Sequence, residues 1–465
     1  MKNTLVFDIG KTHIKSILFN YSGRIIVEYK KNQEFSKKFK KLYIIEVDKI
    51  LEIVTDLIKV ISKKFLINKI IFTTHASTCI LNINENKNLF LPIIDYENIF
   101  DKKFEKIYLK YHKCDFPETL TPNLSGGLLI AKSIFYYIYN LKEKFNLVQS
   151  IIFYPQYFAW RLTGVKSSEI TYLGCHSDLW SFKKKKFSTF VLKNRLEKKI
   201  PKIYKSWKKI GKVKKEILIK TNLYNNCNVY CGGHDSSFSY YLYEKKFKKS
   251  FTLISTGTWI VIFNKEMNSN FLNEKKNIFA KLNVYGKKIP VVRFMGGREY
   301  SNIIKKRTNA INKKNSIGHL IKNKIFVIPS FAEGNPINDM KGKITNQKFI
   351  KTFAEYNNLA SLYIALITDY CLNEMNSNNS IIIDGGFTKN KLFLRYLSAL
   401  RYNQKIYLNK DSNGTAIGAF LLCNKKSNYK LNLTKISNSK IKIINKYKKK
   451  WLDLINKIIF KRNSL

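Results

Sequence analysis

Residues 4–19 read TLVFDIGKTHIKSILF, two apolar runs separated by a short polar turn. β-Branched and aromatic residues in runs of this length predict strands over 4–8 and 13–19, with Asp8-Ile-Gly10 as the tight turn between them. A carboxylate and a glycine at the end of a buried strand are placed where a ligand can approach the backbone.

The elements after the hairpin separate this fold from the dinucleotide-binding class. A third strand is predicted over 24–30, an amphipathic helix over 45–64 and a buried strand over 67–73. A dinucleotide-binding half requires a helix directly after its first strand, and here two strands come first.

The hairpin pattern returns in the second half of the chain. Residues 250–264, SFTLISTGTWIVIFN, again give a strand, a turn of small residues and a strand. We therefore predict an α/β fold with two similar halves, a boundary and hinge near residue 248, and domains 1–248 and 249–465. Other predicted elements are a helical region over 125–163, helices 351–376, 388–402 and 414–423, strands 380–386 and 405–408, a loop over 424–446 and a basic amphipathic C-terminal helix from 447.

Residues 231–237, CGGHDSS, lie between a predicted strand over 226–231 and a predicted helix over 234–244. Asp235 is a good N-terminal helix residue, so a helix cap is one interpretation. The other is a general base, held at the start of a helix behind two glycines.

Three Gly-containing turns each follow an apolar strand: Asp8–Thr12, Ser255–Thr258 and Asp384–Thr388. Free backbone N–H groups and threonine hydroxyls at such turns suit an anion such as phosphate. A single turn of this kind is commonly only a turn, but three in two similar halves favour phosphate binding. None of them matches the P-loop pattern.

The chain has 84 basic and 32 acidic residues, a formal charge of +52. The excess of Lys, Asn, Ile, Tyr and Phe is typical of an AT-rich genome, so no specific nucleic-acid partner is predicted. No signal peptide or membrane span is predicted, and the seven scattered cysteines predict buried thiols rather than disulfides or a metal site. These features favour a cytoplasmic protein and leave a homodimer open.

Several motifs together resemble the FGGY family of carbohydrate kinases, in order from about residue 4 to about 423. They are D-x-G-x-T at Asp8, FYPQYFAWRLTG at 153–164, G-G-H-D at 232–235, S-x-G-T-W at Ser255, D-G-G-x-x-x-N at Asp384 and GTAIGA at 414–419. The resemblance implies two ribonuclease-H-like domains of the actin/hexokinase-like ATPase type with an interdomain cleft. The first would bind sugar, the second ATP, and a phosphoryl group would pass from MgATP to a sugar hydroxyl.

Residue by residue, the resemblance makes Asp235 the catalytic base and Asp8 the residue that organises Mg²⁺, through water. The residues expected to contact ATP are Asp8, Gly10, Lys11, Thr12, Gly257, Thr258, Gly385, Gly386 and Asn390. Lys11 departs from the commonest family pattern and marks a subgroup.

The expected sugar contacts are His75, Asp95, Glu97 and His234. A family tryptophan and arginine are absent near Asp95, so the sugar is specified only as a ketose or deoxy-sugar of the rhamnulose, fuculose or xylulose type. The alternatives are a catalytically inactive sugar- or nucleotide-binding sensor, a structural ATPase of the actin group and a nucleic-acid-binding protein.

Overall fold

The computed structural model describes residues 2–84, 89–113, 115–224, 226–304, 317–337, 341–411 and 413–463. The chain divides into two compact units. Unit 1 comprises Met1–Lys246, Ala280–Ile289 and Asn413–Lys430, and unit 2 comprises Phe247–Phe279, Pro290–Ser412 and Leu431–Leu465. The two later segments of unit 1 lie beyond the boundary that the sequence suggested near residue 248.

Unit 1 is built around a mixed sheet of strand order β14-β15-β6-β1-β2-β3, and β16 also pairs with β6. The strands are β1 (Thr4–Ile9), β2 (His13–Phe19), β3 (Ile25–Asn32), β6 (Lys69–Thr74), β14 (Lys209–Lys212), β15 (Asn228–Tyr230) and β16 (Gly233–His234). β1 runs antiparallel to β2 and parallel to β6, with helix α1 (Val47–Ser62) in the connection. The strands and helix predicted from the first 73 residues are present in that order, but two strands that were not predicted, β4 (Ser36–Phe39) and β5 (Leu42–Ile45), come between β3 and α1.

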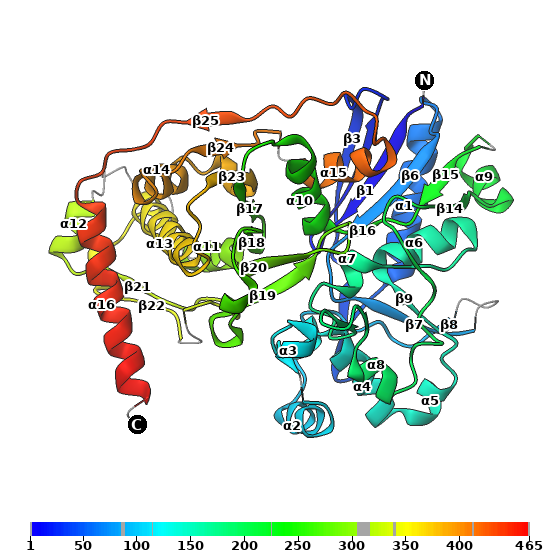
Figure 1. Ribbon diagram of the computed structural model, residues 1–465, viewed down its shortest axis with the longest axis horizontal. Helices are drawn as coiled ribbons and strands as arrows, with labels where there is room; N and C mark the ends of the chain where they lie inside the picture. The colour runs from blue at the N-terminus through cyan, green and yellow to red at the C-terminus, as the bar shows by residue number, and fades with distance from the viewer. Residues whose placement is uncertain are drawn as a thin grey trace. The chain divides into compact units, whose positions relative to one another are not determined.

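The two faces of this sheet are covered by different helices. Phe7 of β1 stacks on Phe72 of β6, with ring centroids 5.2 Å apart, and Phe72 lies 5.5 Å from Phe158 of α6 (Tyr154–Thr163). Val6 and Ile71 are equally buried, and the pleat turns them to the opposite face. Helix α15 (Gly414–Cys423) contacts β1 and β6 there (Figure 1).

Helix α10 (Asp235–Lys246) packs closely on α15. A Cβ atom on Gly418 of α15 would lie only 1.9 Å from the carbonyl oxygen of Phe238 in α10, so only glycine allows this approach. The helix that begins at Asp235 is therefore supported by a helix from late in the sequence.

Unit 2 repeats the strand order of unit 1. Its sheet has the order β19-β20-β18-β17-β23-β24-β25, in which β20-β18-β17-β23-β24 corresponds to β3-β2-β1-β6-β15. The strands are β17 (Phe251–Thr256), β18 (Ile260–Phe263), β19 (Ile278–Leu282), β20 (Lys288–Phe294), β23 (Ser380–Gly385), β24 (Ile406–Leu408) and β25 (Thr434–Ile436). β17 is antiparallel to β18 and parallel to β23, as β1 is to β2 and β6. The similar strand–turn–strand patterns of residues 4–19 and 250–264 therefore correspond to a topology that occurs in both units.

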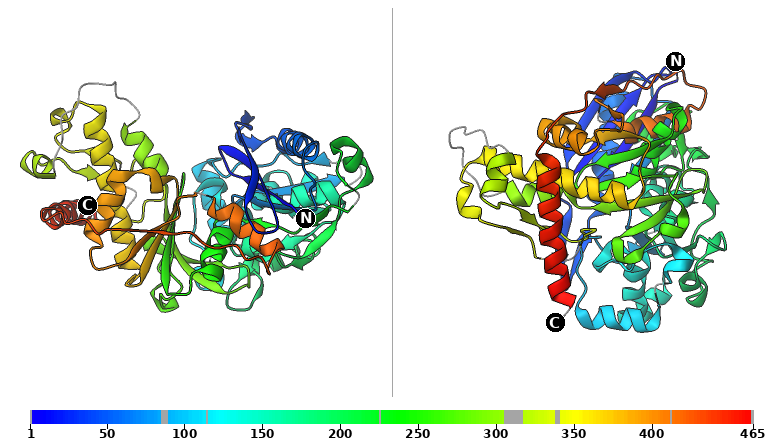
Figure 2. Two further views of the ribbon diagram at one scale, coloured as in Figure 1. Left: turned by 90° about the horizontal axis from the view of Figure 1, so that it is seen from above. Right: turned by 60° about the vertical axis from the view of Figure 1, so that its left-hand side comes forward.

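Long helices cover the sheet of unit 2. α13 (Phe353–Glu374) begins with a capping box between Thr352 and Glu355 and packs on α14 (Lys391–Leu400). The C-terminal helix α16 (Ile444–Asn463), red in Figure 2, inserts Trp451 into the core, and the indole N–H donates to the carbonyl of Val327 at 2.8 Å. The basic C-terminal helix thus packs on its own unit.

Shorter elements complete the described chain. In unit 1 they are β4 (Ser36–Phe39), β5 (Leu42–Ile45), β7 (Cys79–Asn84), β8 (Leu89–Phe90), α2 (Lys102–Tyr111), α3 (Phe116–Thr119), α4 (Ile130–Asn140), α5 (Lys142–Asn146), β9 (Ser150–Phe153), β10 (Ser168–Glu169), α7 (Ile170–Leu173), β11 (Trp180–Ser181), β12 (Lys186–Phe187), α8 (Thr189–Lys193), β13 (Ile203–Tyr204) and α9 (Lys215–Thr221). In unit 2 they are α11 (Gly296–Ile304), α12 (Ile317–Lys322), β21 (Val327–Ile328) and β22 (Lys343–Ile344).

Two local predictions were wrong. The helical region predicted over 125–163 contains strand β9, which pairs with β7; a four-residue apolar run carries no period that separates strand from helix. The loop predicted over 424–446 contains β25 and the first residues of α16.

The prediction of buried thiols holds for the described cysteines. The six described cysteines are all buried and free, while Cys114 lies outside the described residues. None of the helices in the described ranges is long and apolar enough to cross a membrane.

Candidate functional site

Three parallel strands bring Asp8 and Asp235 to one edge of the unit 1 sheet. Asp8 in β1 and Gly233 in β16 are both register partners of Thr73 in β6, one on each side. Asp235 follows β16 directly as the first residue of α10. Because the carboxyl ends of parallel strands meet at one edge, the two predicted carboxylates flank the end of β6.

Both carboxylates have perturbed ionisation. Burial raises the pKa of Asp235 to about 7; the nearby Asp8 charge adds to this, and the ammonium of Lys281 opposes it. Burial likewise raises the pKa of Asp8 to about 6, against the attraction of Lys15. The Asp235 side chain still keeps 31% of its exposure, so a substrate can reach it. Two coupled carboxylates with raised pKa values are typical of a functional site.

Close packing requires glycine at the two positions before His234 and Asp235. Gly232 has a φ of +72°, and a Cβ there would lie 2.1 Å from the carbonyl oxygen of Phe72. A Cβ on Gly233 would lie 2.7 Å from the carboxylate of the buried Glu169. Larger residues would push the chain away from β6, so the glycines fix where Asp235 begins its helix.

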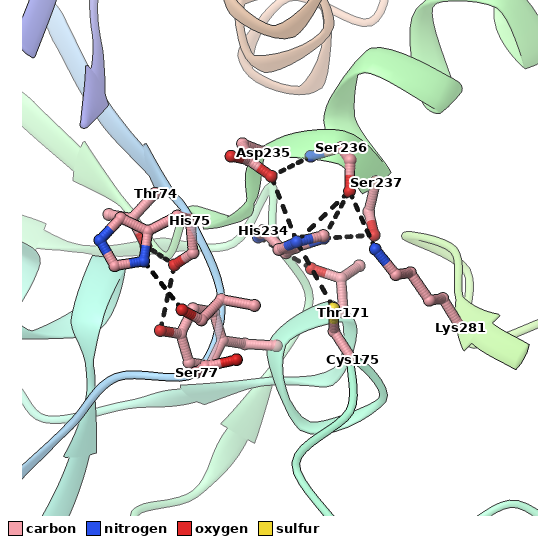
Figure 3. A network of polar contacts seen from close by, with 12 residues as sticks. Thr74, His75, Ser77, Thr171, Cys175, His234, Asp235, Ser236, Ser237 and Lys281 are labelled. Carbon is pink, nitrogen blue, oxygen red and sulfur yellow. Dashed lines mark hydrogen bonds and ion pairs between the residues drawn. The ribbon is translucent and has the colours of Figure 1, made fainter. Parts of the chain in front are cut away.

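His234 is buried beside Asp235 and is held by several side chains. Its Nδ1 lies 3.1 Å from the Ser237 hydroxyl, and its Nε2 lies 3.2 Å from Asp235 Oδ1 and 3.4 Å from Cys175 Sγ (Figure 3). The backbone N–H of His234 donates to the Thr171 hydroxyl. The imidazole therefore lies against the carboxylate, with its orientation fixed.

His75 presents one nitrogen without a hydrogen-bond partner. Its Nδ1 lies 2.8 Å from the carbonyl oxygen of Ala76 and must donate, which leaves the buried Nε2 as an acceptor without a partner. The ring is flanked by Tyr96 and Tyr154, with centroids 5.1 Å away in each case. Burial lowers the pKa of His75 to about 4, so the ring is neutral at physiological pH. A neutral acceptor of this kind suits a donor such as a sugar hydroxyl.

Lys11 and Asp95 contact each other. The Lys11 ammonium and the Ser36 hydroxyl both donate to Asp95 Oδ2, while the backbone N–H of Glu97 donates to Oδ1 at 2.8 Å. Burial opposes ionisation of Asp95, but these donors together hold its pKa below the usual value. The Asp95 carboxylate is thus occupied by protein donors, and the half-buried Glu97 stands beside it.

The turn after β1 is more exposed than the buried carboxylate of Asp95. The backbone N–H of Gly10 donates to the carbonyl of His13, and Thr12 is exposed. Gly10 and Thr12 follow Asp8 at this edge of the sheet, whereas the Lys11 side chain extends to Asp95. The phosphate-facing role of this turn stays a prediction.

Unit 2 contains a pocket of about 580 Å³. Three of the predicted nucleotide contacts line it, Gly257, Gly386 and Asn390, while Thr258 and Gly385 are outside its lining. The other lining residues are Gly297, Tyr300, Ser301, Asn357, Phe387, Lys389, Lys391 and Leu392.

Tight backbone contacts shape this pocket. Gly385 has a φ of +91°, and a Cβ there would lie 1.9 Å from the carbonyl oxygen of Thr256. Gly386, in contrast, has nothing within 4 Å of the position of a Cβ, so its open face borders the pocket. The Asn390 side chain caps α14 by accepting from the N–H of Phe393 at 2.9 Å.

The sequence did not reveal several residues of these sites. Lys281 belongs to unit 1 although it follows the second hairpin, and Gly297, Tyr300 and Asn357 come from helices whose sequences carry no ligand motif. The one available signal was Lys281 itself, a lysine within the apolar strand Ile278–Leu282.

The number of carboxylates at the sheet edge limits the kind of metal ion that fits there. Among the described residues, no group of three or more His, Cys, Asp or Glu side chains could hold a metal ion. Mg²⁺ keeps several water ligands and needs only one or two carboxylates, so Asp8, with Asp235 nearby, fits that ion. A metal ion that takes all of its ligands from the protein does not fit these side chains.

Two family models match the chain. The FGGY family of carbohydrate kinases, N-terminal domain, matches residues 3–241, and carbohydrate kinase FGGY, C-terminal domain, matches residues 248–430. A comparison with curated proteins found no relative.

Solved structures of low sequence identity share the fold over nearly the whole chain. A carbohydrate kinase from Novosphingobium aromaticivorans has a TM-score of 0.81 and 21% identity, covering 98% of this chain and 99% of its own. A ligand-bound xylulose kinase from Lactobacillus acidophilus has a TM-score of 0.80 and 16% identity, covering 100% and 98%. Plasmodium falciparum glycerol kinase with ADP has a TM-score of 0.74 and 16% identity, covering 98% of both. The predicted α/β fold of the actin/hexokinase-like ATPase type is confirmed.

Proposed function

Because the chain belongs to the FGGY family of carbohydrate kinases, a family of phosphotransferases, we propose that it transfers the γ-phosphoryl group of MgATP to a hydroxyl of a ketose or deoxy-sugar. The observation that carries this proposal is the partly exposed Asp235 carboxylate, which has a pKa of about 7 and stands beside Asp8 at the edge of the unit 1 sheet. The xylulose kinase among the similar structures is named for a ketose, which is consistent with such an acceptor.

Asp235 acts as the general base in this proposal. A carboxylate with a pKa near the working pH is ionised often enough to accept the proton of the attacking hydroxyl. Its position at the start of α10 and the contact with His234 hold the carboxylate in place while it keeps 31% of its exposure.

Asp8 and the turn after it are assigned to the transferred phosphoryl group. The Asp8 carboxylate would hold Mg²⁺ through water, and the ion would neutralise charge on the phosphate oxygens. The Gly10 N–H is already bonded to the carbonyl of His13, so the backbone N–H groups of Lys11 and Thr12 are the ones assigned to the phosphate.

The unit 2 pocket is assigned to the nucleotide. Its volume of about 580 Å³ suits a small ligand, and Lys389 and Lys391 place positive charge at its rim. Gly257 and Gly386 allow phosphates to approach the backbone there, as glycines do in other phosphate sites.

The sugar is assigned to the side of unit 1 that carries His75. The neutral Nε2 of His75 accepts from a sugar hydroxyl, and the half-buried Glu97 offers a further polar contact. His234, whose ring nitrogens contact Ser237, Asp235 and Cys175, is assigned to this side through its contact with Asp235. Asp95 contributes through Lys11 and Ser36, which it holds in place, rather than as an open acceptor.

The test is coupled ADP release with MgATP and a panel of ketoses, polyols and deoxy-sugars, using wild type, Asp235→Asn and the exposed control Asp56→Asn. We expect turnover with one sugar, a loss of at least ~100-fold in Asp235→Asn and no change in Asp56→Asn. Saturable sugar or nucleotide binding without turnover on any acceptor would instead favour the catalytically inactive sensor.

A further inference from the structure

Strand β19 (Ile278–Leu282) is buried along its whole length and yet contains a lysine. Lys281 is only 2% exposed. An ammonium group is costly to bury unless other groups compensate its charge, so its surroundings indicate why it is there.

The end of β19 is fixed against the first turn of α10. Lys281 Nζ donates to the Ser236 hydroxyl at 3.3 Å (Figure 3). The carbonyl of the next residue, Leu282, accepts from the Ser237 hydroxyl at 3.4 Å. The Leu282 N–H also donates to the carbonyl of Gly174 at 3.1 Å, where any side chain at residue 174 would collide with Leu282. Both residues that follow Asp235 are therefore tied to this strand.

Lys281 is also one of the charged or titratable groups that act on Asp235. Within unit 1 these groups are Asp8 from β1, His234 from β16 and Lys281 from β19. Burial and Asp8 favour the protonated carboxyl group, and Lys281 favours the carboxylate. The Ser236 backbone N–H, on the residue held by Lys281, donates to Asp235 Oδ1.

We propose that Lys281 is a positioning residue for phosphoryl transfer: its ammonium holds Ser236 at the start of α10 and stabilises the Asp235 carboxylate that accepts the substrate proton. The proposal rests on the proposed function of Asp235. It assigns a role to a residue from the second half of the sequence that matches none of the motifs.

The test compares steady-state kinetics of wild type, Lys281→Met, Asp235→Asn and the double variant, with Lys287→Met as control. Lys287 is exposed in the same hairpin, so its loss removes an equal charge without touching α10. We expect Lys281→Met to lower kcat about tenfold or more while KM for sugar and ATP changes less than about twofold, since the lysine contacts neither substrate. In the Asp235→Asn background, Lys281→Met should have no further effect, because it acts through that carboxylate.

A merely structural lysine would give another pattern. Equal losses in both backgrounds, or a rise in both KM values with unchanged kcat, would overturn the positioning role while leaving the kinase proposal intact. Absence of sugar-dependent turnover in wild type would overturn both proposals. If Lys281→Met does not fold, Ser236→Ala removes the same hydrogen bond from a small side chain, and wild-type kcat in that variant would equally reject the role.

Discussion

Lys11 Nζ is hydrogen-bonded to the carboxylate of Asp95, joining the turn after the first strand to a loop 84 residues later. The two partners differ in burial, since the Lys11 side chain keeps 15% of its exposure and Asp95 only 1%. A lysine without this partner can turn its ammonium to water, whereas the carboxylate cannot reach water.

This asymmetry predicts unequal costs of removing each partner. Lys11→Met leaves a buried carboxylate without its counter-charge and should lower the free energy of unfolding by about 3 kcal/mol. Asp95→Asn keeps an acceptor for Ser36 and should cost about 1 kcal/mol. Urea unfolding of both variants and of the double variant measures this, and a larger loss in Asp95→Asn than in Lys11→Met would contradict the prediction.

The pKa of Asp235 predicts an acid limb in the pH profile. Because the base must be ionised and its pKa is about 7, kcat/KM for the sugar should rise through neutral pH and level off on the alkaline side. Rates measured at saturating MgATP provide the test, and a profile that stays flat down to pH ~5 would contradict a base of this pKa.

The same shift predicts how stability depends on pH. The folded pKa of Asp235, about 7, lies above the ordinary value of 3.8, so the folded state binds the proton more tightly. The stability contributed by this group is therefore complete below the ordinary pKa and is lost as the pH rises through the folded pKa. Asp235→Asn lacks this loss, so its Tm relative to wild type should increase from acidic to alkaline pH.

Calorimetry across that pH range measures the Tm difference. The exposed Asp56→Asn serves as control and should show a constant difference. A difference for Asp235→Asn that is equally constant would show that the carboxylate has the same pKa folded and unfolded.

Two glycines of the unit 2 pocket should respond differently to alanine. A Cβ on Gly297 would lie 2.3 Å from the carbonyl oxygen of Gly257, so Gly297→Ala should cost about 1–3 kcal/mol of stability. Gly386→Ala meets no atom within 4 Å and should keep the wild-type Tm, but its methyl group would occupy the face assigned to phosphate and weaken MgADP binding about tenfold. Calorimetric titration with MgADP measures the second effect, and unchanged affinity would remove Gly386 from the nucleotide site.

The parts of the fold predicted from sequence are those with strong local patterns. The hairpins at 4–19 and 250–264, helix α13 and the motif around Asp235 are each specified by neighbouring residues, and the family that they indicated is confirmed. Strand β9 was missed because four apolar residues do not distinguish strand from helix without the partner strand β7.

Contacts between residues that are far apart in the sequence could not be predicted from local sequence patterns. The ammonium of Lys281 reaches Ser236 because the segment Ala280–Ile289, which includes the end of β19, belongs to unit 1. The contact of Lys11 with Asp95 depends on a loop outside every motif. The roles assigned to His75, Thr258 and the other site residues stay predictions, since chemistry and not position decides them.

Unit 1 also has a consequence for biosynthesis. Its last segment, with α15 and the close approach of Gly418 to Phe238, follows Lys246 by roughly 180 residues of chain. At about 5–20 residues per second, a ribosome needs on the order of 10–40 s to add them. During that interval the helix that begins at Asp235 lacks its main packing partner, and the apolar face of β1 and β6 that α15 covers stays exposed. We therefore expect the nascent first half to show this apolar face until translation is nearly complete, and a gene cut near residue 248 to yield a fragment with the same exposed face.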